Sequence, residues 1–198
     1  MPHREIVTVL LAIGSFVLSL YTLWLTQLRH GRLRMTQPTF ICLKREGRVA
    51  MPKVFLRTLL FTTASKGRVV ENMYMRLNAP VGTYLFDFWG HTDDAGKLTF
   101  GSGLFVGQQG VAFNHHFDPP RNPELFLFQD GEYRMEMYAT TIGRKTPWKL
   151  LDVAFMLDSE QAAELYQIYS RELFLLWNSE TRTYDVRAES PEKSSTRM

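Results

Sequence analysis

The sequence predicts a mainly β protein that has one N-terminal transmembrane helix, a β-sandwich domain and one short late α-helix. Residues 6–28 form an apolar run without a single charge. Residues 39–157 alternate between apolar and polar side chains in short runs that turn residues separate, which is the pattern of strands. We therefore divide the chain into a short N-tail (1–5), the transmembrane helix (6–28), a basic connector (29–38), the β-sandwich domain (39–187) and a polar tail (188–198) expected to be disordered.

The run from Ile6 to Leu28 is long enough to cross a bilayer. As a helix it spans about 34 Å, against about 30 Å for the hydrocarbon core. A cleaved secretory signal has a shorter apolar core followed by a small-x-small cleavage site, and this sequence has neither. The lipid bilayer is therefore the first predicted partner.

Basic residues near the helix predict its orientation. Arg4 precedes the helix beside Glu5, whereas the other side carries the membrane-flanking basic residues Arg29, Arg32 and Arg34. The positive-inside rule then places a single-pass protein in the inner (plasma) membrane with its C-terminal domain in the cytoplasm. The single cysteine, Cys42, fits that side because it cannot form an intramolecular disulfide.

The net charge of +3 does not predict a nucleic-acid partner. From Met35 onward the chain carries 19 Lys and Arg and 19 Asp and Glu, so its excess positive charge lies entirely around the helix. Such charges contribute to topology and to contact with anionic headgroups. We expect no nucleic acid.

Small residues recur along the helix in alternating steps of four and three, the spacing of a packing seam. This helix-packing seam consists of Thr8, Ala12, Ser15, Ser19, Thr22 and Thr26. It predicts a homodimer or a partner membrane protein that packs against the helix. The alternative is that its hydroxyls bond back to carbonyls of their own helix.

The candidate strands of the sandwich are 39–43, 53–62, 68–77, 83–90, 98–106, 111–117, 125–129, 132–141 and 149–157. The spacers between them are too short for repeated helical crossovers, which excludes a parallel βαβ sheet. Asp158 or Ser159 can cap a short amphipathic helix that ends near Tyr169. A final hairpin follows from Leu173–Trp177 and Thr183–Val186.

The segment Asp130–Ala139 contains a Gly-x-Tyr sequence at the start of a strand, with Tyr133 on its apolar face. It resembles the tyrosine corner of immunoglobulin-like sandwiches, in which the tyrosine hydroxyl ties the strand to the preceding loop. Without a cysteine pair, only cysteine-free relatives of that fold are compatible.

The arrangement as a whole resembles uncharacterised bacterial single-pass membrane proteins that have a small immunoglobulin-like, β-rich domain. The stretches that carry this resemblance are Phe55–Phe61 through Leu77, Gly101–Gly107, and Asn114-His115-His116. It implies an architecture and no activity.

The search for chemistry finds weak candidates only. The glycine run from Gly101 to Gly110 has the wrong spacing for a dinucleotide loop and no helix after it, so we expect no cofactor and no catalytic residue. The weak metal-site candidates are His91, Asp93, His115 and His116. His115 and His116 point to opposite faces of a strand, so at most one of them can join a given site; the alternative is a polar hairpin with structural histidines. Cys42 is expected to be a small apolar filler.

The function predicted from these features is recognition or scaffolding by a membrane-anchored sandwich without an evident catalytic site. Aromatic residues on both faces around Phe88-Trp89 and His115-His116-Phe117 fit either a partly exposed binding patch or an ordinary aromatic core, and the core is the favoured interpretation. One alternative is a metal-dependent hydrolase that uses His91, Asp93 and His115 or His116. Another is an extracytoplasmic ligand-binding module.

Overall fold

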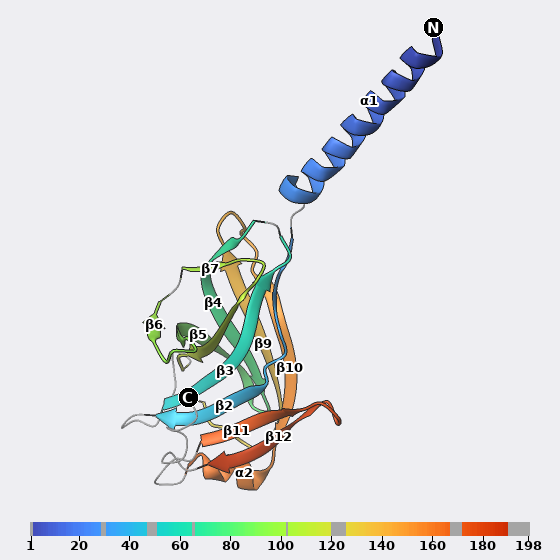
Figure 1. Cartoon of the computed structure of the whole chain (residues 1–198). Coiled ribbons are helices and arrows are strands. Elements are labelled where there is room, and N and C mark those ends of the chain that lie inside the picture. Colours follow the sequence, from blue (N-terminus) through green and yellow to red (C-terminus); the bar gives the residue numbers. More distant parts are fainter. Residues whose placement is uncertain are drawn as a thin grey trace.

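The N-terminal helix stands apart from a β-rich domain (Figure 1). The computed structural model describes residues 2–28, 31–46, 51–64, 66–101, 103–119, 126–166 and 172–189. Helix α1 covers Pro2–Leu23 and continues into a π-helical turn, η1 (Trp24–Leu28). Every side chain from Arg4 to Trp24 is exposed, so this apolar helix buries nothing against the domain. The predicted helix is confirmed; the predicted disordered tail falls mostly on residues 190–198, outside the described residues.

The rest of the described chain is almost entirely strand, with one short helix, α2 (Ser159–Glu164). The strands are β1 (Leu33–Met35), β2 (Phe40–Glu46), β3 (Met51–Thr62), β4 (Arg68–Ala79), β5 (Gly82–Thr92), β6 (Leu98–Phe100), β7 (Leu104–Val106), β8 (Val111–Phe117), β9 (Gly131–Thr141), β10 (Trp148–Leu157), β11 (Glu172–Asn178) and β12 (Thr183–Glu189). The mainly β class, the N-terminal apolar helix and the short later helix are therefore confirmed.

The strands form one nearly closed, barrel-like sheet. Their order is β10-β9-β4-β5-β8-β3-β2-β11-β12, with β1, β6 and β7 as short additions. Strand β5 joins the two walls, because its first half pairs with β4 and its second half pairs with β8 across a β-bulge. At the other side of the barrel β10 lies near β1 and β12. The immunoglobulin-like arrangement of this sheet stays a prediction.

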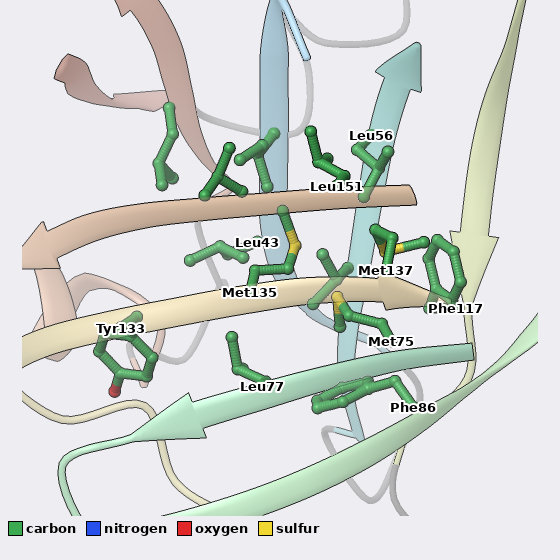
Figure 2. Close-up of a cluster of buried hydrophobic side chains, with 14 of the residues drawn as sticks. Leu43, Leu56, Met75, Leu77, Phe86, Phe117, Tyr133, Met135, Met137 and Leu151 are labelled. Carbon is green, nitrogen blue, oxygen red and sulfur yellow. The ribbon is translucent and has the colours of Figure 1, made fainter. Parts of the chain in front are cut away.

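The core fills the inside of this sheet. Strand β3 shows the alternation clearly, since every second residue from Val54 to Leu60 points inward and is buried, while Phe55, Arg57 and Leu59 are partly exposed. Across the interior they face apolar side chains of β4, β9 and β10 (Figure 2). Alternate residues of each strand therefore supply the core and an outer face.

A local tie closes the end of the barrel that lies away from α1. The Tyr133 hydroxyl donates to the Gln129 carbonyl at 2.8 Å and accepts from the Gln129 amide at 2.7 Å. Tyr133 is itself fully buried. This is the strand-to-loop tie that the Gly-x-Tyr sequence predicts.

Three expected elements differ from the structure. The connector predicted at residues 29–38 contains a short strand, since residues 33–35 pair with the end of β3. The single strand expected at 98–106 is two, because Gly101 and Gly103 turn the chain with positive φ angles of 89° and 97°. Residues 126–129 form no strand; Phe126 and Phe128 alternate as expected, but they close the barrel end as buried side chains without a neighbouring strand.

Candidate functional site: a groove on the outer face of the sheet

The outer face of the wall formed by β12, β11, β2, β3 and β8 carries a groove with a volume of about 320 Å³. Its size is at the lower end of the range for ligand pockets, and its lining is mostly apolar with a few polar groups, as such pockets usually are. The lining residues are Phe40, Cys42, Lys44, Phe55, Thr92, Asn114, His116, Phe174, Leu176, Arg187 and Glu189.

One row of directly opposed residues forms the floor of the groove. Successive partners in the strand register are Arg187, Phe174, Cys42, Phe55 and His116, on β12, β11, β2, β3 and β8. Directly opposed residues of antiparallel strands point to the same face. The hollow forms because the small Cys42 side chain lies between two phenylalanines.

The Cys42 thiol lies at the bottom of the hollow and is only 3 % exposed. Burial, with a smaller contribution from the nearby Glu172 carboxylate, raises the pKa of this thiol far above its usual value. The thiol therefore stays protonated at neutral pH and is a poor nucleophile. These facts support its expected role as a small apolar filler.

Charged groups border one end of the groove. Lys44 lies 3.5 Å from the Glu172 carboxylate and 4.6 Å from the centre of the Phe55 ring, so its ammonium group is held over the floor. Glu172 is 8 % exposed, and its second carboxylate oxygen is buried without a hydrogen-bond partner among the described residues. Arg187 is exposed at the rim, and Glu189, two residues further along β12 and opposite Glu172, also lines this part of the groove.

Polar groups border the other end. Thr92 Oγ1 and His116 Nε2 lie 2.9 Å apart, and the His116 ring packs edge-on against Phe55 at 4.6 Å. The side-chain oxygen of Asn114 is buried and has no hydrogen-bond partner within the described part of the chain. It can accept a hydrogen bond from a ligand that enters the groove.

The structure separates the metal-site candidates. His115 points into the barrel and His116 points outward, as expected for strand neighbours. His91 is the register partner of His115 and stacks on Phe113 at 4.2 Å, while the Asp93 carboxylate accepts from the amides of Ala95 and Lys97 in its own turn. Among the described residues no three His, Cys, Asp or Glu side chains form a group that could hold a metal.

His115 is the most unusual of these residues. It is fully buried, and neither of its ring nitrogens has a hydrogen-bond partner among the described residues. Burial, and to a smaller extent His91 and His116, lowers its pKa to about 3. The ring is therefore neutral at physiological pH.

The helix-packing seam has hydroxyls that are already satisfied. Thr8, Ser19, Thr22 and Thr26 each donate to a carbonyl four residues earlier in the same helix, at 2.8–2.9 Å. This is the alternative stated above, and helix packing through the seam stays a prediction. Of the membrane-flanking basic residues, Arg32 and Arg34 are exposed, and Arg29 lies outside the described residues.

The sequence pointed to part of the site only. Of the aromatic patch expected around residues 88–89 and 115–117, His116 lines the groove and Trp89 packs near it at 5.6 Å. Phe88 and Phe117 instead pack together at 5.8 Å inside the barrel. Phe40, Phe174 and Arg187 were missed, because only the strand order brings them beside Phe55.

Comparison with known proteins adds no function. No protein-family model matches the chain, and no curated protein sequence is similar to it. Among solved structures there is a likeness to a family 123 glycoside hydrolase from Clostridium perfringens, which is described as hydrolysing glycolipid glycans. That likeness has 11 % identity and a TM-score of 0.35, and it covers 66 % of this chain but only 28 % of the hydrolase. At this level it carries no argument about activity.

Proposed function

We propose that this chain is a single-pass membrane protein whose barrel-like domain is a recognition module, and that the outer groove receives an apolar segment of a partner protein. The observation that carries the proposal is the row Arg187-Phe174-Cys42-Phe55-His116, an apolar floor with a basic group at one end. The floor crosses five strands and is therefore about 19 Å long. A long, shallow row suits an extended polypeptide better than a compact metabolite.

The polar groups at the rim of the groove indicate which kind of partner segment can bind there. The exposed guanidinium of Arg187 can bind a carboxylate in bidentate geometry, and Asn114 offers an unused acceptor to a backbone amide. The preferred segment therefore has two or three large apolar side chains followed by an acidic residue. Aromatic and aliphatic anchors in a desolvated hollow supply most of the affinity in such interfaces.

Position-specific photocrosslinking tests this use of the groove. A benzoylphenylalanine placed at Leu176, in the groove, should give a discrete adduct in native membranes that the same group at Leu85 does not give. Leu85 is a matched control because it is an exposed leucine, 52 % accessible, on β5 and outside the groove. Equal adducts from both positions, or none from either, would contradict the proposal.

Membrane anchoring by α1 is the second part of the proposal. Its window Arg4–Thr26 has the length and composition of a span and no buried residue. Tyr21 and Trp24 stack at 6.3 Å near its end, where aromatic rings prefer the headgroup layer. The positive-inside rule favours a cytoplasmic barrel.

Arginine substitution within the helix tests the anchor. Leu11→Arg together with Leu18→Arg should release most of the full chain from membranes during alkaline carbonate extraction, because each arginine costs about 2.5–3.5 kcal/mol at the bilayer centre. Met156→Arg, on the outer face of β10, should leave the chain in the pellet. A double variant that stays membrane-bound would refute the anchor, and digestion of the barrel by protease added outside intact cells would refute its cytoplasmic side.

A further inference from the structure

The end of the barrel nearest α1 binds the connector that follows the helix. The Arg68 guanidinium donates to the Gly31 carbonyl at 2.8 Å, and the Thr63 amide donates to the Arg32 carbonyl at 3.0 Å. Only two residues separate Leu28 from Gly31, and three extended peptide steps reach about 11 Å at most. If α1 spans a bilayer, this end of the barrel stays within about one headgroup layer of the hydrocarbon.

Three turns meet at this helix-proximal end, which we define as residues 31–36, 60–64, 66–70, 104–112 and 141–148. The Thr62 amide donates to the Gly107 carbonyl at 3.4 Å, and the Ile142 amide donates to the Val69 carbonyl at 3.2 Å. Figure 1 shows β7 and the turn between β9 and β10 beside the end of α1. The short connection to α1 therefore brings these turns to the bilayer surface.

Large apolar side chains project from this end. Phe105 is 63 % exposed and Ile142 is 64 % exposed, although both lie on ordered backbone. The Phe105 ring lies directly against Gly67, where any Cβ would collide with it. Exposed apolar groups held in this way at a membrane-facing end can enter the headgroup layer.

The charges of the domain are segregated between its two ends. The helix-proximal end contains no Asp or Glu, and its basic residues are Arg32, Arg34, Lys66, Arg68, Arg144 and Lys145. The opposite end, residues 44–46, 51–53, 117–119, 126–132 and 157–166, is acidic on balance. Its basic residues are Lys44, Arg45 and Lys53, and its acidic residues are Glu46, Asp118, Asp130, Glu132, Asp158, Glu160 and Glu164. The described barrel therefore carries a net positive charge at the end near α1 and a net negative charge at the opposite end.

We infer that the helix-proximal end docks against an anionic bilayer surface, with Phe105 and Ile142 in the headgroup layer. The grounds are the short connection to α1, these two exposed apolar side chains and the difference in charge between the two ends of the barrel. This inference rests on the membrane anchoring proposed above. An anionic surface attracts the basic end and repels the acidic end, so both charge sets favour one orientation. Docking of this kind keeps the axis of the barrel perpendicular to the membrane. The groove lies on the side wall of the barrel and therefore stays accessible to a partner.

Fluorescence quenching of the full chain in nanodiscs tests the docking. A bimane label is attached at Gln109→Cys, in the turn after β7, or at Met156→Cys, an exposed site toward the acidic end, each in a Cys42→Ala background. The nanodiscs contain either phosphatidylglycerol with phosphatidylcholine or phosphatidylcholine alone, each with a nitroxide-headgroup lipid. We expect strong quenching at residue 109 only, and only with phosphatidylglycerol.

Charge reversal at the helix-proximal end is the second test of docking. Lys66→Glu with Lys145→Glu should reduce the docking equilibrium about fivefold for each positive charge removed, whereas Lys97→Glu, in the turn between β5 and β6, should leave quenching unchanged. Equal quenching at residues 109 and 156, or no effect of the double reversal, would overturn docking. A chain retained in nanodiscs but unquenched at residue 109 overturns docking alone, whereas a chain that does not enter nanodiscs overturns the anchor as well.

Discussion

Replacing Tyr133 with phenylalanine is expected to lower the free energy of unfolding by about 2–4 kcal/mol. The substitution removes one hydroxyl that satisfies both the amide and the carbonyl of Gln129. Those backbone groups hold the segment that carries Phe126 and Phe128 against the end of the barrel. Burial raises the pKa of Tyr133 to about 12, so the hydroxyl stays protonated and can donate throughout the usual pH range.

Chemical denaturation of the full chain in detergent, followed by far-UV circular dichroism, measures this effect. The matched control is Tyr74→Phe, since Tyr74 stacks on Tyr138 at 5.1 Å and lies on the partly exposed face of β4. The control should change stability by less than about 0.5 kcal/mol. A Tyr133→Phe loss no larger than that of the control would mean that the tie is not structural.

Replacing His115 with leucine is expected to stabilise the protein and to weaken its sensitivity to acid. The folded protein buries both ring nitrogens without partners, which costs about 1–3 kcal/mol at neutral pH. Because burial lowers the pKa of His115 to about 3, the unfolded chain binds a proton below its ordinary pKa of 6.5 while the folded chain does not. Stability is therefore lost as the pH falls from 6.5 towards 3, by about 2 kcal/mol between pH 6.5 and pH 5.

Unfolding free energies at pH 7 and pH 5 test this prediction. The His115→Leu variant should be more stable than the wild type at both values and should lose less stability at pH 5. His91 faces the same ring, and burial also lowers its pKa, with Asp93 acting in the opposite direction. The ring of His91 is more exposed, so His91→Leu is expected to reduce the acid sensitivity less. If His115→Leu lost as much unfolding free energy between pH 7 and pH 5 as the wild type, the account of this histidine would be contradicted.

The features that the sequence predicted correctly are local. The apolar run at 6–28, the alternation of β3 and the Gly-x-Tyr tie each depend on residues that are close in the chain. The opposite orientations of His115 and His116 also follow from the two-residue period of a strand. The face that points inward could not be predicted, because it depends on which strands lie beside β8.

The groove could not be predicted because its residues meet only through long-range pairing. Phe174 lies opposite Cys42, and Phe55 lies opposite both Cys42 and His116, through the order β11-β2-β3-β8. Strand order is not encoded in local periodicity. The same limit explains residues 126–129, whose alternation is that of a strand although no neighbouring strand is available to pair with them.

The central claim is that the hollow above Cys42 receives a partner, and filling that hollow tests it most directly. The measurement is the yield of the Leu176 photocrosslinked adduct in native membranes from the wild type, Cys42→Leu and Cys42→Ala. Leucine occupies the space between Phe55 and Phe174, whereas alanine leaves it open. We predict that the adduct is lost in Cys42→Leu and kept in Cys42→Ala, with both variants folded by circular dichroism; an undiminished adduct in folded Cys42→Leu would contradict the claim.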